Sequence, residues 1–176
     1  MIYIKSNDDF YLKNIIFSLN QKELPIINDR SSKYFFELDL HFDNESLRIN
    51  TSNEKIFLKL PISFEQFFSE IKKILINKFV TIKDFNYGPV KQSISYKDKT
   101  IHLNYIHNII IANLILNKDS GIDKFLLYQL IWPNDKDAQI NKLDTHITNL
   151  KNKVVNELNI DLKIITSGGI LKLIID

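Results

Sequence analysis

The stretch NKLDTHITNLKNK (residues 141–153) decides how the second half of this chain is interpreted. Its apolar residues Leu143, Ile147 and Leu150 recur at helical spacing and predict one buried face. The opposite face is polar, and no acidic residue follows Asp144 within the stretch. A solvated surface helix would show this pattern, and so would a helix whose polar face touches an anionic partner. The sequence on either side distinguishes the two.

The elements around this helix predict a compact domain. Upstream, FNYGPV, SISYK and TIHLN (residues 85–90, 93–97 and 100–104) are typical of short strands. Helical patterns follow at residues 104–116, with Gly121 as a stop, and at residues 124–132, with Asp123 as the cap. After the third helix, two apolar strands flank Gly168 and Gly169, which predicts a hairpin. Three helices followed by a hairpin are the layout of a winged helix-turn-helix, in which the third helix reads DNA.

Residues 85–173 resemble the DNA-binding domain of OmpR/PhoB-type response regulators. Ile131 and Trp132 match the end of the family's second helix. The residues that match its third helix in register are Asp144, His146, Ile147, Leu150 and Lys151. The resemblance implies a transcription regulator that binds double-stranded DNA.

Three departures from the family pattern concern DNA contacts. Asn141 stands where the family has an arginine, Ser167 replaces the wing arginine, and Leu171 replaces the wing tyrosine. In the family these groups hold phosphates or enter the minor groove. Each lost phosphate contact is expected to weaken affinity and flatten its salt dependence.

The resemblance assigns roles along the third helix. Leu143, Ile147, Leu150 and Val154 are expected to pack inward, whereas Thr145 and Asn149 point into the major groove. Asn152 is a weaker candidate for a base contact. Trp132 is expected to be a core residue first, whose indole N–H can also reach a phosphate. The predicted DNA-binding residues are Asn141, Lys142, Thr145, His146, Thr148, Asn149, Lys151, Asn152, Lys153, Ser167 and Gly168.

The first half, residues 1–80, resembles a receiver domain only at its ends. Residues 2–19 look like the first strand and helix, and residues 55–75 look like the last strand, a Lys-Pro element and the final helix. Between them, strand patterns at residues 24–28, 33–42 and 46–50 leave no room for the middle helices of a receiver. The expected fold is thus a truncated, receiver-like α/β domain at residues 1–80, followed by an α+β winged helix-turn-helix domain at residues 85–176.

The receiver's phosphorylation chemistry has few candidates here. The family's acidic pair falls on Ser6 and Asn7, and Asp39, expected at a strand end, is the one carboxylate that could mimic the acceptor. Regulation is therefore expected to be independent of phosphorylation. The helix at residues 63–78, with Ser63 and Gln66 as a capping box, is expected either to pack on the sheet or to pair two copies in a homodimer.

Composition sets the remaining expectations. The net charge is +2, and all of the surplus comes from residues 88–176, which contain 11 lysines and 9 acids. No cysteine is present, which excludes thiolate metal sites and cysteine nucleophiles. The histidines lack metal-ligand spacing, and no glycine-rich phosphate loop or nucleophile elbow occurs. We expect no enzyme, metal or cofactor, and a cytoplasmic protein with neither a signal peptide nor a membrane span.

A second interpretation stays open at this stage. The loop at residues 133–139 resembles the segment with which the family contacts RNA polymerase, although a plain polar linker explains it equally well. The weakened wing is compatible with a protein-interaction module that contacts polymerase or another regulator and does not read DNA sequence.

Overall fold

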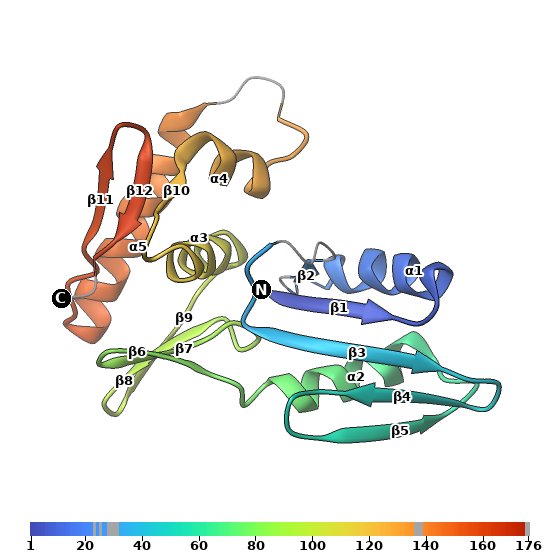
Figure 1. Cartoon of the computed structure of the whole chain (residues 1–176). Helices are drawn as coiled ribbons and strands as arrows, with labels where there is room; N and C mark the ends of the chain where they lie inside the picture. The colour runs from blue at the N-terminus through green and yellow to red at the C-terminus, as the bar shows by residue number, and fades with distance from the viewer. Residues whose placement is uncertain (23, 25, 28–31, 136–138, 175–176) are drawn as a thin grey trace. The chain divides into compact units, whose positions relative to one another are not determined.

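A computed structural model describes residues 1–22, 24, 26–27, 32–135 and 139–174 of the chain (Figure 1). The chain forms two compact units, Met1–Lys78 and Phe79–Asp176. Both mix helices with sheets, and the described residues contain five helices.

Unit 1 is built on a five-stranded sheet with the order β2-β1-β3-β4-β5. Its strands are β1 (Ile2–Ser6), β2 (Ile26–Ile27), β3 (Phe36–Phe42), β4 (Ser46–Asn50) and β5 (Lys55–Lys59). β1 is parallel to β2 and β3, whereas β4 is antiparallel to both of its neighbours. β5 therefore runs in the same direction as β1 and β3, and these three strands end at one edge of the sheet.

Two helices complete unit 1. α1 (Asp9–Asn20) begins at Asp8, whose carboxylate accepts the backbone N–H groups of Phe10 and Tyr11 at 3.0 Å each. α2 (Phe64–Leu75) begins with the predicted capping box, in which Ser63 and Gln66 exchange hydrogen bonds of 3.2 and 3.3 Å. The capping box predicted at Ser63 and Gln66 is confirmed.

The core of unit 1 lies on one face of the sheet. The strand residues that are at most 1% exposed on this face are Ile2, Ile4, Leu38, Leu40, Leu47 and Ile49. α2 contributes the buried residues Phe67, Ile71, Ile74 and Leu75. Most of its apolar face is therefore buried within unit 1. The opposite face of the sheet carries charged side chains, among them Lys5, Glu37 and Asp39.

Unit 2 opens with a four-stranded antiparallel sheet in sequence order. Its strands are β6 (Val80–Ile82), β7 (Phe85–Gly88), β8 (Ser93–Tyr96) and β9 (Lys99–His102). The sequence predicted the last three, but β6 was missed because its three residues lie in the segment taken as the domain boundary. A tight turn joins β6 to β7, with Lys83 at φ +47°.

Three helices follow the sheet: α3 (Tyr105–Leu116), α4 (Lys124–Ile131) and α5 (Ile140–Leu158). Asp123 caps α4, as expected, and Asn104, which was predicted to be the first residue of the helix, caps α3. α3 is buried on nearly all sides and is tied to the sheet by polar contacts. The Tyr87 hydroxyl donates to Asn108 Oδ1 at 2.6 Å, and Asn108 Nδ2 donates to the Pro89 carbonyl at 3.0 Å.

A small second sheet carries the hairpin. Its order is β10-β12-β11, with β10 (Ile122–Asp123), β11 (Ile164–Ser167) and β12 (Ile170–Leu173). Gly168 and Gly169 have φ values of +55° and +80° and form the predicted two-residue turn. Gly121 does not end α3, which stops at Leu116; it turns the chain into β10, a two-residue strand too short to predict from its sequence.

Candidate nucleic-acid interface

α5 buries one face and presents the other. Leu158 joins Leu143, Ile147, Leu150 and Val154 on the buried face, each at most 7% exposed, so the inward-packing residues predicted for this helix are confirmed. The spacing of these residues places a polar row on the opposite side of the helix. The exposed residues of this row are Asn141, Thr145, Thr148, Asn149 and Asn152.

The outward row has the chemistry of a base-reading surface. Thr145, Asn149 and Asn152 follow at spacings of four and three residues and lie on the same side of α5. An asparagine amide can pair with the N6 and N7 atoms of adenine, and a threonine methyl can touch a thymine methyl. The Thr145 hydroxyl donates to the Asn141 carbonyl at 3.0 Å, which leaves its methyl group available for such a contact.

The lysines of α5 flank this row, and two of them have partners. Lys142 Nζ lies 4.2 Å from the centroid of the Trp132 ring and 3.6 Å from Asp135 Oδ2. Lys153 Nζ lies 3.9 Å from Glu157 Oε1. Lys151 forms no ion pair within the part of the chain that the structure describes. An anion beside this row would have to compete with Asp135 for Lys142, but no acidic side chain in the described part of the chain pairs with Lys151.

His146 and Trp132 lie beside the outward row and not on it. The centroid of the half-buried His146 ring is 5.6 Å from that of Trp132 and 5.8 Å from that of His107 on α3. Trp132 also packs on the fully buried Tyr128 at 4.7 Å. The structure therefore places both residues in an aromatic cluster between the helices. Trp132 is half-buried there, at the margin of the core in which the sequence analysis expected it.

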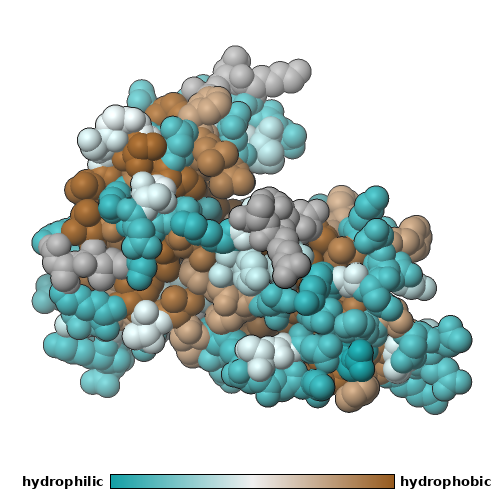
Figure 2. All heavy atoms as spheres, in the orientation of Figure 1, coloured by the Kyte–Doolittle hydropathy of each residue, from teal (hydrophilic) through white to brown (hydrophobic). Residues whose placement is uncertain are grey.

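The wing presents little positive charge. Ser167 and Gly168 lie exposed at its tip, but its outer face carries Ile165 and Ile170, which are 49% and 38% exposed. Lys172, the one lysine of the wing strands, donates from its Nζ to the Asp119 carbonyl at 2.7 Å. Leu171 is fully buried, so the position that matches the wing tyrosine of the family belongs to the core. Figure 2 shows apolar atoms reaching the surface around this hairpin and α4.

α4 adds an apolar outer face to the same unit. Phe125, Leu126 and Leu130 are about half exposed, at 49%, 50% and 47%. The loop after α4 leads to α5. Of the predicted polymerase-contacting loop, residues 136–138 lie outside the described part of the chain. Asp135 within this loop accepts a 2.6 Å hydrogen bond from the Tyr128 hydroxyl, which holds it against α4.

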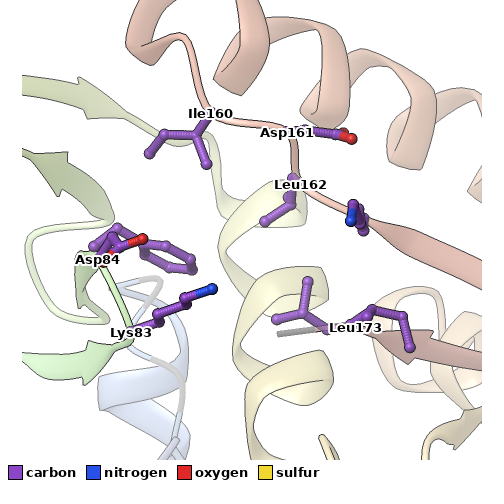
Figure 3. Close-up of a pocket in the computed structure, with 9 residues that line it drawn as sticks. Lys83, Asp84, Ile160, Asp161, Leu162 and Leu173 are labelled. Carbon is purple, nitrogen blue, oxygen red and sulfur yellow. The ribbon is translucent and has the colours of Figure 1, made fainter. Parts of the chain in front are cut away.

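A small cavity in unit 2 lies apart from the predicted site residues (Figure 3). Its volume is about 180 Å³, and its charged lining residues are Lys83, Asp84, Asp161 and Lys163. The remaining lining residues come from β7, the segment after α5 and the end of β12. None of the predicted DNA-binding residues lines it, so this cavity plays no part in the interface described here.

The residues of unit 1 that match the phosphorylation site of a receiver lie in β1, directly after β1 and in β3. Asp39 lies inside β3 rather than at its end, and its Oδ2 is 3.1 Å from His41 Nε2 and 3.7 Å from Lys5 Nζ. Asn7, one of the two positions that match the acidic pair, donates to the Phe42 carbonyl and accepts from the Phe42 N–H at 2.9 and 2.8 Å. The side-chain amide of Asn7 therefore forms the two hydrogen bonds that a backbone amide would form there, and it extends the pairing of β1 with β3.

Two other carboxylates line a cavity of about 620 Å³ at the edge of the sheet where β1, β3 and β5 end, Asp8 and Asp43. Asp8 caps α1, and Asp43 accepts hydrogen bonds from the backbone N–H groups of Glu45 and Ser46 and from the Ser46 hydroxyl. Both therefore organise local backbone. Among the described residues, no group of three or more potential ligands could hold a metal ion. None of the described helices is long and apolar enough to cross a membrane.

Comparisons with known proteins give similarity at the level of structure alone. No protein-family model matches the sequence, and no curated protein matches it. The DNA-binding domain of CadC from Escherichia coli shares 14% identity over 56% of this chain and 92% of that one, with a TM-score of 0.48. The C-terminal domain of NsrR, the nisin resistance regulator, shares 26% identity over 55% and 96%, with a TM-score of 0.45.

One solved structure is similar along both units. It belongs to a family of streptococcal redox sensors evolved from two-component response regulators, and it shares 11% identity over 98% of this chain, with a TM-score of 0.43. This chain spans 66% of that protein's length. These neighbours are DNA-binding or response-regulator-derived proteins. All three TM-scores lie below 0.5, so the arguments that follow rest on the geometry of the chain itself.

Proposed function

We propose that this protein is a DNA-binding transcription regulator that reads the major groove with α5. The observation that carries the proposal is the outward row of α5, where exposed Thr145, Asn149 and Asn152 present groups that can read base edges. The helix is preceded by α3 and α4 and followed by a two-residue hairpin, which is the order in which a winged helix presents its reading helix.

The lysines that flank the outward row support a small number of contacts with DNA phosphates. Lys151 is available for a phosphate, and Lys142 and Lys153 can exchange weak intramolecular pairs for phosphates, because exposed ion pairs contribute little. The wing adds Ser167 and Gly168 but no arginine. We therefore expect affinity that depends on few phosphate contacts and on pairing two half-sites.

The proposal is tested by selecting binding sites from random duplex DNA at low salt. An enriched motif supports it, and no enrichment even at the highest protein concentration contradicts it. On the selected site, Asn149→Ala should relax the preference at one base pair, whereas Lys151→Gln should weaken binding to all sequences and reduce the salt slope by about 1. Asn53→Ala and Lys55→Gln, exposed changes in unit 1, are the matched controls and should alter neither property.

We propose further that unit 1 is a degenerate receiver that acts without phosphorylation. Asp39 in β3 lies close to His41 of the same strand and to Lys5 of β1. Asn7, at a position where a receiver needs an acid, instead accepts a hydrogen bond from the backbone N–H of Phe42. Treatment of the full chain with acetyl phosphate should leave its mass unchanged. A stoichiometric gain of one phosphate that Asp39→Asn abolishes would overturn this part of the proposal.

The regulator is proposed to act as a homodimer through unit 1. α2 has only its outward side left for this role, where Phe64 and Phe68 are half-buried and stacked at 6.2 Å. α1 is the competing surface, because Phe10 and Phe17 are 73% and 68% exposed. Sedimentation of the full chain should show a dimer that Phe68→Ser weakens. A dimer that only Phe10→Ser and Phe17→Ser disrupt would move the interface to α1, and a monomer at all concentrations would refute it.

A second candidate function is a protein-interaction module that contacts RNA polymerase or another regulator. The half-exposed Phe125, Leu126 and Leu130 of α4 favour it, together with Ile165 and Ile170 on the wing. Purified RNA polymerase is the probe. Binding that Leu126→Ser and Leu130→Ser abolish, in a chain for which Asn149→Ala changes no DNA binding, would replace the first proposal with this one.

A further inference from the structure

Two histidines from different helices meet beneath the polar row of α5. His107 lies in the first turn of α3 and His146 in α5, and their rings are 5.8 Å apart in an edge-to-face arrangement of 76°. His107 is only 7% exposed. Within the described residues, His107 Nε2 and His146 Nδ1 are both buried and lack a hydrogen-bond partner.

The charged groups around the pair are mostly positive. α5 brings Lys153 toward His107, and it brings Lys142 over the ring of Trp132, which in turn packs on His146. Each of these two lysines also has an acidic partner, because Asp135 pairs with Lys142 at 3.6 Å and Glu157 with Lys153 at 3.9 Å. β9, which also packs on α5, contributes the exposed side chains of Lys99 and His102.

This environment favours a neutral His107 ring. Burial lowers the pKa of His107 below its ordinary 6.5, and the positive charges of His146 and Lys153 lower it further. The start of α3 adds the positive end of a helix dipole. A protonated imidazole carries two N–H donors, and the buried nitrogens of this pair have no acceptors to receive them.

We propose that the His107–His146 pair is an acid-sensitive contact that holds α5 against α3 while His107 is neutral and loosens when His107 is protonated. Protonation of His107 places a buried positive ring against His146 and near Lys153, and the structure relieves this by separating α3 from α5. The base-reading row belongs to α5, so acidification should weaken DNA binding as well as folding. Only that second consequence depends on the proposed DNA-binding function.

The direction of the effect follows from linkage. A histidine whose folded-state pKa lies below its unfolded value of 6.5 binds fewer protons when folded. The stability it contributes is complete above pH 6.5 and is lost as the pH falls from there through the lowered pKa. Stability should therefore decrease on acidification through this range, before the carboxylates titrate.

The first experiment compares full-length wild type with the double variant His107→Phe, His146→Phe, which keeps two aromatic rings and removes both titrating groups. The equilibrium constant of unfolding is measured by urea denaturation at pH 7.5 and pH 5.5. Lowering the pH between these values should raise this constant at least about twofold more for the wild type than for the variant. His102→Gln, an exposed control on β9, should behave as wild type. Equal pH profiles for wild type and double variant would refute the proposal.

A second measurement needs no substitution. In a proton NMR titration of the wild type, the ring signals of His107 should titrate below the ordinary histidine pKa of 6.5. Titration of His107 at or above 6.5 would also refute the proposal.

DNA provides the third readout. On any DNA site selected above, wild-type affinity should fall by at least about twofold more than that of the double variant between pH 7.5 and 5.5, after measurement at matched salt. If no site is selected at all, the DNA-binding function fails while the unfolding and NMR measurements still decide the histidine contact.

Discussion

The ammonium group of Lys124 lies 2.6 Å from Asp144 Oδ1 and 2.8 Å from Asp144 Oδ2, and this pair joins the first residue of α4 to α5. The side chain of Lys124 is 18% exposed and that of Asp144 is 47% exposed. The contact therefore holds α4 and α5 against each other across a partly buried interface. It also pairs Asp144, the one acidic residue in the stretch 141–153.

Breaking this pair should destabilise unit 2. We expect a double-mutant cycle of Lys124→Met and Asp144→Asn to give a coupling free energy of about 1 kcal/mol in urea unfolding, at the upper end for a pair that is not fully buried. Lys73→Met and Glu70→Gln form the comparison cycle, because that pair at 2.6 Å lies along one turn of α2 and its lysine is exposed. A Lys124–Asp144 coupling no larger than that of the comparison would show that the α4–α5 bridge contributes no more than a surface pair.

Removing the hydroxyl of Tyr87 should be more costly. The group is fully buried and donates to Asn108 Oδ1, so Tyr87→Phe leaves a buried amide oxygen with one hydrogen bond fewer. We expect a loss of about 1–3 kcal/mol in the free energy of unfolding, measured by urea denaturation. Tyr11→Phe, at a position that is 49% exposed, is the control and should be nearly neutral.

Gly121 should tolerate no side chain. Its φ is +75°, and a Cβ there would lie 2.5 Å from Ile170 Cγ2 and 2.9 Å from the Leu171 carbonyl oxygen. Gly121→Ala combines the left-handed penalty of about 1–2 kcal/mol with a backbone clash, and we expect a loss of at least about 2 kcal/mol by thermal or urea unfolding. Gly168→Ala has a positive φ but nothing within 4 Å, so it separates the two effects. Equal losses at both positions would mean that the clash is relieved at no cost.

The pH response of Asp43 should depend on Ser46. The Ser46 hydroxyl and the N–H groups of Glu45 and Ser46 hold the pKa of Asp43 below its ordinary 3.8. A lowered carboxyl pKa contributes stability above pH 3.8 that is lost as the pH falls through the lowered value. In an NMR titration of the side-chain carboxyl carbon, Ser46→Ala should raise the pKa of Asp43, while Thr51→Ala in the next turn should not.

The regular elements were predictable because their signals are local. The caps Asp8, Ser63, Asn104 and Asp123 each stand directly before an apolar periodic run, and the glycine pair at 168 and 169 marks a two-residue hairpin. β6 and β10 were missed because strands of three and two residues are fixed by their partners and not by their own pattern.

The site was predictable only in part. The inward face of α5 follows from its periodicity, and the exposed row follows from the inward face. The partners of the lysines do not follow from this periodicity. Lys142 contacts Trp132 at the end of α4 and Asp135 in the loop after it, and no pattern within α5 indicates these contacts. Likewise, no spacing in the sequence relates His107 to His146, which meet only because α3 packs on α5. Asp39 was expected at a strand end, although the predicted strand at residues 33–42 already ran to the residue at which β3 ends, so its place inside the strand could have been inferred from the sequence.

The reversed strand β4 has a consequence for how unit 1 folds. A crossover to a parallel strand requires distant parts of the chain to meet before any pairing forms, whereas β3, β4 and β5 pair as a meander of neighbours in the sequence. This lowers the contact order of the unit. The meander can therefore assemble by local hairpin formation before β1 pairs with β3. Compared with a fully parallel sheet of the same strand order, unit 1 should fold faster and expose an unpaired parallel edge for a shorter time.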